Sequence, residues 1–205
     1  MNRLSEDEKK QGYRLLFDGE TLQGWAATSH PEGWLVQDGK IVCKGGTDGY
    51  LYTIEQFENF ILKLEYRTAA KVNSGIFFRW SDLADPVNTG LEMQILDTYG
   101  QPTVDKHSSG ALYDLVAPSS NAVRPAGEWN EVTIQCNQSL VQLTLNGIMV
   151  VEADIDQWTT ASQNPDGTKN KFKYAWRDLP RRGHIGLQDH GGYVEFCNIK
   201  IQPLP

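Results

Sequence analysis

The sequence predicts an all-β fold, an antiparallel sandwich of two sheets arranged as a jelly roll. The main observation is a series of about eleven short segments in which apolar and polar residues alternate, as they do on strands that bury one face. Two Asx-Gly pairs, Asp38-Gly39 and Asn146-Gly147, separate such segments and predict tight hairpins, because both turn positions favour a positive φ. No segment has the periodicity of a long helix, which argues against an α/β architecture.

Length and composition indicate one globular domain. The chain has 205 residues, of which 40% are hydrophobic and 22% charged, enough apolar material for a core. We expect a polar N-terminal extension over residues 1–12 and a single jelly-roll domain over residues 13–205. The net charge of −7 argues against a nucleic-acid partner, which would require a basic patch.

The cysteines and the N-terminus bear on the cellular compartment. Cys43, Cys136 and Cys197 each fall in a predicted strand without disulfide-framework or metal-ligand spacing, so we expect buried, reduced thiols. The N-terminal segment lacks the apolar stretch of a signal peptide, and no apolar run is long enough to span a membrane. As written, the sequence predicts a cytoplasmic protein with no membrane partner, or an exported one if a signal peptide has been removed.

The chain is expected to begin with a short helix and to continue as strands. Ser5 and Glu8 form a capping-box pattern that predicts a helix over Glu6–Gln11. The segment from Asp154 to Arg182 is polar and interrupted by Gly and Pro, which predicts a long structured loop of the kind that often covers a site. We expect the last two strands to pair with each other. The predicted strands are Trp34–Gln37, Lys40–Cys43, Tyr50–Thr53, Phe60–Arg67, Gly75–Trp80, Leu91–Asp97, Glu128–Cys136, Leu140–Leu145, Ile148–Ala153, His184–Asp189 and Tyr193–Ile201.

The strand pair within residues 73–97 is the segment around which the predicted fold is organised. In its second strand Glu92 and Gln94 point away from the apolar row, because side chains alternate along a strand. Such a strand belongs to a sheet that is buried on one side only. We therefore expect Glu92 and Gln94 on an open concave surface, with three residues in the core, namely Leu91, Met93 and Ile95.

Polar residues recur on the exposed faces of other predicted strands. For a single strand a solvated face is the ordinary explanation, but strands that are neighbours in one sheet would combine these residues into a site. The candidates are Glu65, Arg67, Arg79, Glu92, Gln94, His184, Gln188 and His190, with Asn73, Asp97 and Tyr113 from adjacent loops. Such a set suits a sugar, whose hydroxyls bind carboxylate, carboxamide and guanidinium groups and whose ring packs on an aromatic side chain. A carboxylate and an imidazole also supply an acid–base pair.

Other enzyme classes fit the sequence poorly. It has no phosphate-binding loop of P-loop or Rossmann spacing and no G-x-S-x-G motif of a serine hydrolase. A standard glycosidase needs two carboxylates across one glycosidic bond, whereas the central strand has Glu92 and the carboxamide of Gln94 on one face. This pair is better suited to proton abstraction or to metal binding.

Seven motifs extend from about Tyr13 to Leu204 and read LLFDGETLQGW, WLVQDGKIVC, NSGIFFR, GLEMQILD, GALYDLVAP, GEWN and GHIGLQDHGGYVEFCNIKI. Together they resemble the family of 3-keto-disaccharide hydrolases, long known as a domain of unknown function with a concanavalin-like or laminin-G-like jelly roll. The resemblance implies action on glycosides whose C3 hydroxyl has been oxidised to a ketone. One departure is visible, because Cys197 replaces the arginine of the family's usual F-R-N-I. The site positions that the resemblance implies are Asn73, Arg79, Glu92, Gln94, Asp97, Gln188, Asp189 and His190.

A ketone at C3 explains how so small a site would suffice. It acidifies the C2 proton, so that a base can form an enolate that expels the aglycone from C1, after which water adds to the enone. We assign Glu92 or His190 as the base and Arg79 or a divalent metal as the group that stabilises the enolate, with Glu92 and His190 as candidate metal ligands. No organic cofactor is expected. The candidate substrate-binding residues are Asn73, Gln94, Asp97, Tyr113, Gln188, Asp189 and Glu65.

Three functions are compatible with the sequence. A hydrolase, or lyase, of 3-keto-glycosides is favoured, with a small carbohydrate as its substrate. A non-catalytic carbohydrate-binding module is the main alternative, because lectin-like sandwiches bind sugars with the same polar sheet faces. A structural interaction domain is the least favoured, because it does not explain a cluster of Glu, Arg, Gln and His. The pattern leaves the oligomeric state open.

Overall fold

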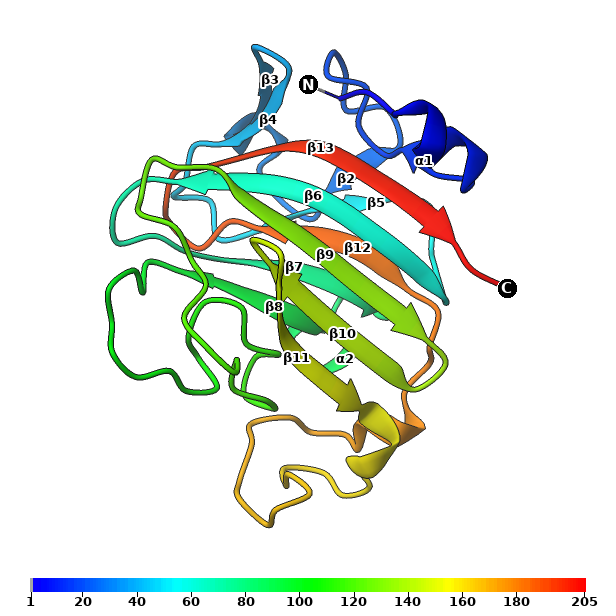
Figure 1. Ribbon diagram of the computed structural model, residues 1–205, viewed down its shortest axis with the longest axis vertical. Coiled ribbons are helices and arrows are strands. Elements are labelled where there is room, and N and C mark those ends of the chain that lie inside the picture. Colours follow the sequence, from blue (N-terminus) through cyan, green and yellow to red (C-terminus); the bar gives the residue numbers. More distant parts are fainter. Residues whose placement is uncertain (1) are drawn as a thin grey trace.

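The computed structural model describes residues 2–205 and contains two antiparallel sheets packed face to face (Figure 1). The larger sheet has the strand order β11 (Ile148–Asp154), β10 (Leu140–Leu145), β9 (Asn130–Asn137), β6 (Phe60–Thr68), β13 (Val194–Pro203), β4 (Lys40–Cys43) and β3 (Trp34–Gln37), and β1 (Arg14–Leu15) also pairs with β13. The smaller sheet has the order β2 (Trp25–Ala27), β5 (Tyr50–Thr53), β12 (His184–Gln188), β7 (Asn73–Trp80) and β8 (Leu91–Leu96). The predicted two-sheet β-sandwich is confirmed.

Helical segments are short and lie outside the sheets. The helix α1 (Glu6–Lys10) has the predicted capping box, in which Ser5 accepts from the Glu8 amide and the Glu8 side chain accepts from the Ser5 amide. Across residues 2–205, no helix is long and apolar enough to cross a membrane. The other helical turns are α2 (Pro86–Thr89), η1 (Pro31–Gly33), η2 (Ile155–Gln157) and η3 (Trp176–Asp178).

The core lies between the two sheets and follows the alternation of the strands. On β8, Leu91, Met93 and Ile95 are no more than 2% exposed and face the larger sheet, as predicted. On β6 the same alternation buries Phe60, Leu62, Leu64 and Tyr66. A slip of one residue in either strand would place these apolar side chains in water, so the alternation fixes the register.

The two predicted hairpins are present. Asp38 and Gly39 join β3 to β4 with φ values of 50° and 74°, and Asn146 and Gly147 join β10 to β11 with 52° and 81°. Positive φ at both turn positions matches the right-handed twist of the flanking strands. These short connections hold four strands of the larger sheet in place.

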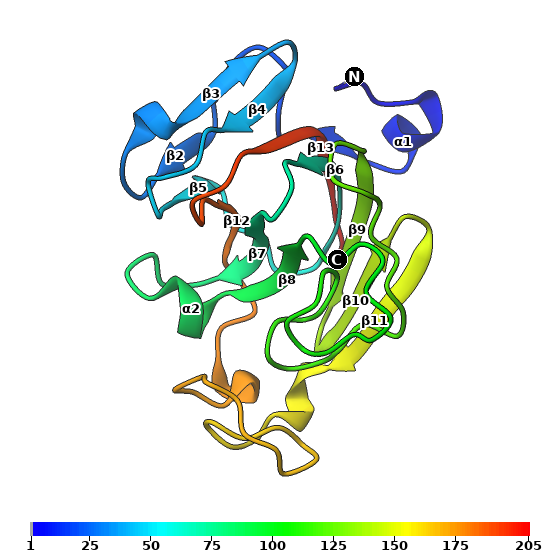
Figure 2. The same ribbon diagram turned by 90° about the vertical axis from the view of Figure 1, so that its left-hand side faces the viewer.

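The pairing of the last two strands was predicted wrongly. The penultimate strand, β12, lies between β5 and β7 in the smaller sheet, whereas β13 lies between β6 and β4 in the larger one (Figure 2). Local alternation defines which side of a strand is buried but not which strands are neighbours. The outward face of β6, with Glu65 and Arg67, is consequently on the opposite side of the sandwich from β8.

The three cysteines are buried and free, as expected. Burial raises the pKa of each thiol to about 12. Cys197, at the position of the family's usual arginine, pairs in register with Glu65 on the larger sheet. That departure from the family pattern therefore lies away from β8.

A segment near residue 112 covers the free edge of β8. The Gln94 amide donates to the Ala111 carbonyl at 3.0 Å, and the Tyr113 amide donates to the Glu92 carbonyl at 2.9 Å. Met93 and Leu112 form an isolated antiparallel bridge between these two hydrogen bonds. The segment therefore acts as an extra edge strand, and Tyr113 lies directly opposite Glu92.

Candidate active site

The outward face of the smaller sheet combines polar and aromatic side chains from four strands. We call it the small-sheet face. The strand register places Gln188 beside Tyr50, Gly75 beside Gln94, and Phe77 beside Glu92. Their sequence neighbours belong to the core cluster, so these side chains point away from the larger sheet. The small-sheet face consists of Tyr50, Tyr52, Gly75, Phe77, Glu92, Gln94, Gly186 and Gln188.

The carboxylate of Glu92 lies directly over Gly75. A Cβ atom at position 75 would be 2.8 Å from Cδ of Glu92 and closer still to Oε1, so no larger residue fits while Glu92 keeps this position. The glycine of the NSGIFFR motif thus provides the space that the glutamate of GLEMQILD occupies. Gly75 pairs with Gln94, two residues beyond Glu92, so the glutamate side chain leans along its own strand.

Glu92 is a partly buried carboxylate without compensating hydrogen bonds. Burial raises its pKa to about 8, and the positive charge of Lys171 acts weakly in the opposite direction. Within residues 2–205, no hydrogen bond or ion pair engages this carboxylate. A carboxyl group with a pKa near 8 is a stronger base than an ordinary glutamate and can accept a proton from a carbon acid.

Two phenols and a carboxamide surround the glutamate. Burial, together with the charge of Glu92, raises the pKa of Tyr50 and of Tyr113, so both hydroxyls are neutral donors at physiological pH. Gln188 donates from Nε2 to the Tyr50 hydroxyl at 3.4 Å. Its Oε1 is buried and, within residues 2–205, has no hydrogen-bond partner. These groups are suited to binding sugar hydroxyls around the base.

The long loop after β11 contributes a lysine. Lys171 is exposed, its Nζ lies 4.1 Å from the centre of the Tyr113 ring, and its amide donates to Asp114 at 2.8 Å. Burial of part of the side chain lowers the pKa of Lys171, while the charges of Glu92 and Asp114 act to raise it. The sequence prediction missed this residue, because an isolated lysine in an aperiodic loop has no signal in the pattern.

Aromatic side chains form the floor of the small-sheet face next to Glu92. Tyr50 packs edge-on against Phe77 at 5.0 Å between ring centres and lies 5.1 Å from Trp80. Tyr52 also packs edge-on against Trp80, at 5.7 Å. Tyr50 and Tyr52 are only partly buried, so an apolar surface of the kind that packs against a sugar ring adjoins the polar groups.

Five of the predicted site residues lie together around this face: Asn73, Glu92, Gln94, Tyr113 and Gln188. Gln94 is only 3% exposed and donates from Nε2 to Oδ1 of Asn73 at 2.7 Å. The expectation that Gln94 faces an open surface is therefore wrong, because its side chain is buried and bonded within the protein. Gln94 and Asn73 support the floor of the face.

Arg79 does not lie on the small-sheet face, contrary to the prediction. The register between β7 and β12 shifts, with Phe77 opposite Gly186 but Trp80 opposite His184, so an extra residue of β7 interrupts the alternation. Arg79 has a φ of 51° in this bulge, is 2% exposed, and donates to the carbonyl of Glu58 at 2.9 Å. Its guanidinium joins the strand to its neighbours and is not beside Glu92.

The remaining predicted residues have other surroundings. His190 lies in the turn after β12, with its side chain 54% exposed and its Nδ1 3.7 Å from Asp48. Asp189 is buried in the same turn and accepts hydrogen bonds from Thr47 and Gly191, and these offset the effect of burial and lower its pKa. Asp97 accepts from the Lys71 amide, and Glu65 accepts from Asn198 on the outward face of the larger sheet.

The donor groups near Glu92 do not fit a divalent metal. They comprise one carboxylate, a carboxamide and two phenols, next to the ammonium group of Lys171. A hard divalent cation in proteins is held by several carboxylate or imidazole ligands, and a neighbouring ammonium would repel it. Across residues 2–205, no cluster of three or more His, Cys, Asp or Glu side chains is arranged to hold a metal ion.

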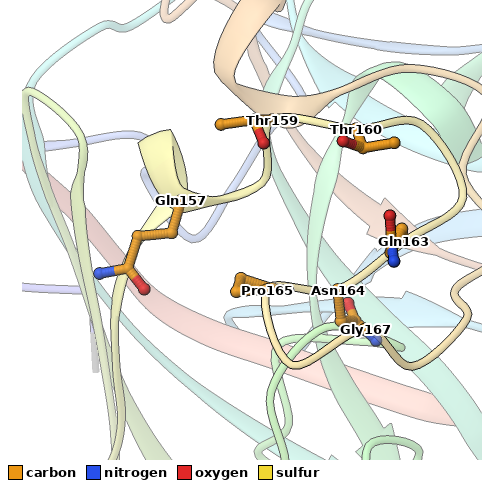
Figure 3. A pocket seen from close by; sticks show the side chains of 7 residues that line it. All are labelled: Gln157, Thr159, Thr160, Gln163, Asn164, Pro165 and Gly167. Carbon is orange, nitrogen blue, oxygen red and sulfur yellow. The ribbon is translucent and has the colours of Figure 1, made fainter.

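A hollow of about 210 Å³ lies within the long loop itself (Figure 3). The polar side chains that line it carry amides and hydroxyls, and none of them is titratable. One of them, Asn164, is buried and accepts from Trp158 at 2.8 Å and from Asn170 at 3.0 Å. These bonds shape the loop that carries Lys171. The hollow is lined by Gln157, Thr159, Thr160, Gln163, Asn164, Pro165 and Gly167.

The chain belongs to the family described as the 3-keto-alpha-glucoside-1,2-lyase-like domain, whose model matches residues 12–202. It is 29% identical over 239 aligned positions to a 3-keto-disaccharide hydrolase of Bacteroides thetaiotaomicron, and the match covers all of this chain and 82% of that protein. Among solved structures it is similar to a putative glycosyl hydrolase of Parabacteroides distasonis, with 32% identity and a TM-score of 0.84. The match covers 94% of this chain and 99% of the other. A second such protein of that organism has 28% identity and a TM-score of 0.82, and the match covers 100% of this chain and 99% of the other. These similarities confirm the family that the motifs indicated.

Proposed function

We propose that this protein hydrolyses 3-keto-glycosides by elimination and hydration, with Glu92 as the base. The observation that supports this most strongly is a carboxylate that has no hydrogen bond to any of residues 2–205 and whose pKa burial raises to about 8. One base suffices for a 3-keto-glycoside, because the carbonyl makes the C2 proton acidic and places the glycosidic oxygen β to it. An ordinary glycoside lacks this activation and would require a second carboxylate across the bond.

The proposed reaction has two stages. Glu92 takes the C2 proton, the C2–H electron pair forms the C2=C3 bond, and the carbonyl electrons move to O3. The enolate then re-forms its carbonyl, C1=C2 forms, and the C1–O bond breaks, so that the aglycone leaves and takes a proton from water. In the second stage hydroxide from that water adds to C1, and Glu92 returns its proton to C2. The net reaction is hydrolysis, and Glu92 ends ionised as it began.

The neighbouring groups are assigned to substrate binding. The buried Oε1 of Gln188 is available to a sugar hydroxyl, and the phenol of Tyr50 donates or accepts beside it. The partly exposed rings of Tyr50 and Tyr52, which pack on the buried Trp80, offer contact to a pyranose ring. Removing any one of these contacts should raise KM more than it lowers kcat, because they are made in the ground state as well.

The test compares an ordinary glucoside with its 3-keto counterpart carrying the same chromogenic aglycone. Release of aglycone from the 3-keto sugar alone supports the proposal, and the Glu92→Gln protein serves as the matched control. Saturable binding of the sugar without release would contradict the proposal and support a carbohydrate-binding module. Equal release from both sugars would also contradict it, since the ketone would then have no role.

A further inference from the structure

We infer that Lys171 is the cation that stabilises the enolate oxygen during proton abstraction, the role that the sequence prediction gave to Arg79 or to a metal. This inference rests on the proposed function, because it assigns the second charged group of the same site. It brings the loop between β11 and β12 into the active site as a contributor of a catalytic residue.

Both the backbone and the side chain of Lys171 contact the segment that contains Tyr113 and Asp114. Its amide donates to the carboxylate of Asp114, the residue that follows Tyr113, and Tyr113 lies opposite Glu92 at the edge of β8. The ammonium group lies over the Tyr113 ring at 4.1 Å. Lys171 is thus attached to the segment that pairs with β8 at Glu92, while the residue remains exposed.

Several contacts stabilise the charged ammonium group of Lys171, against the partial burial that lowers its pKa, and they favour a permanent cation over a proton donor. The face of the Tyr113 ring attracts the ammonium group only while it is charged, and the ring of Phe172 lies 5.9 Å from the same nitrogen. The carboxylates of Glu92 and Asp114 also stabilise the protonated form. A lysine that gave up its proton in each turnover would lose these four interactions, so a fixed electrostatic role is the better assignment.

The charge balance of the first step explains what such a cation does. Before the step the negative charge is on Glu92, and afterwards it is on O3 of the sugar, two bonds away from the C2 atom that lost its proton. A cation beside both positions stabilises the charge where it develops, and the net charge of the site stays the same. Preorganised groups of this kind typically contribute about 10²–10³-fold to kcat.

The test uses three variants and 3-keto-glucosides whose aglycones range from 4-nitrophenol to a simple alcohol. Lys171→Met should lower kcat/KM by about 10²-fold for every aglycone alike, because enolate formation precedes departure of the leaving group. Lys171→Arg should recover part of the rate because it retains the charge. Lys173→Met is the matched control, since Lys173 is in the same loop but is exposed and paired with Asp85 at 3.0 Å, and its rate should not change.

The pH profile separates a catalytic from a structural role. The groups that face Glu92 are Lys171, Tyr113 and Tyr50, while Asp114 and His107 border the lysine and the phenol. Loss of the Lys171 charge should move the acidic limb of kcat/KM to higher pH, which mere loosening of the loop would not do. A Lys171→Met protein with a rate within twofold of the original, or with a defect confined to poor leaving groups, would overturn the inference. No cleavage by the unsubstituted protein would instead refute the proposed function, and this inference with it.

Discussion

The outward faces of the two sheets both carry glutamates, but their surroundings differ. On the larger sheet, Glu195 is bound by Arg67 at 2.5 Å and by Lys40 at 3.3 Å, and these partners outweigh the effect of burial and lower its pKa. On the smaller sheet, Glu92 is partly buried and has no hydrogen-bonding partner in the part of the chain that the structure describes. Burial therefore raises its pKa to about 8.

The presence or absence of a charged partner distinguishes a carboxylate that stabilises the fold from one that is available for a reaction. A buried charge that is paired supports the fold, and removing its partner is costly. A buried charge that is left unpaired costs stability, and proteins retain such groups mainly where a reaction uses them. Substitutions on one face at a time separate these two roles.

The largest expected effect is on activity and comes from Glu92→Gln. This substitution keeps the shape of the side chain and removes the base, so kcat for a 3-keto-glycoside should fall by ~10²–10⁴-fold. Steady-state kinetics measures it. Glu65→Gln, on the other sheet, is the matched control and should leave the rate within about twofold; an equal loss in both variants would refute the distinction between the faces.

A smaller effect is expected when Glu92 is displaced without being removed. Gly75→Ala places a methyl group within 2.8 Å of Cδ of Glu92, so the carboxylate must move by about an ångström. A displacement of that size costs up to ~10²-fold in rate. In the Glu92→Gln background the same substitution should have almost no further effect, because the shared target is gone. Additive losses in the double variant would show that Gly75 acts on something else.

The sequence predicted the fold better than it predicted the site. Alternation and two hairpin turns identified the strands and placed Glu92 opposite a buried row, because those properties are local. The neighbours of β12 and the inward turn of Arg79 depend on pairing between distant segments and on one extra residue in β7, for which the sequence has no local signal. Lys171 lies close enough for its charge to act on Glu92 because the backbone of its loop is bound to Asp114, a contact between segments that are far apart in the sequence.

On the larger sheet the expected effect is on stability. Glu195→Gln should lower the free energy of unfolding by about 1–3 kcal/mol at pH 7, because it leaves Arg67 and Lys40 with a weaker partner. Since the folded-state pKa of Glu195 is lowered, this contribution is present above its unfolded pKa and is lost as the pH falls through the folded value. Urea unfolding at pH 7 and pH 3 measures it. A constant difference between the two pH values would contradict the assignment.

A second effect on stability has the opposite sign. The pKa of Glu92 is raised in the folded state, so stability from its protonated form is complete below the unfolded pKa of about 4.3 and is lost as the pH rises to about 8. Glu92→Gln cannot ionise and should therefore melt a few degrees higher than the original protein at pH 8, with each kcal/mol giving about 2–4 °C. At pH 4 the two melting temperatures should coincide. A variant that melts lower at pH 8 would show that the carboxylate has a stabilising partner.

The pH dependence of kcat/KM for a 3-keto-glucoside tests the central claim most directly, because its acidic limb reports the base of the free enzyme. If Glu92 is the base, kcat/KM rises with pH to a plateau, with a midpoint at about 8, the pKa to which burial raises Glu92. The residual rate of Glu92→Gln should lack that limb. A midpoint near the ordinary glutamate value of about 4.3, or the same limb in Glu92→Gln, would contradict Glu92 as the base.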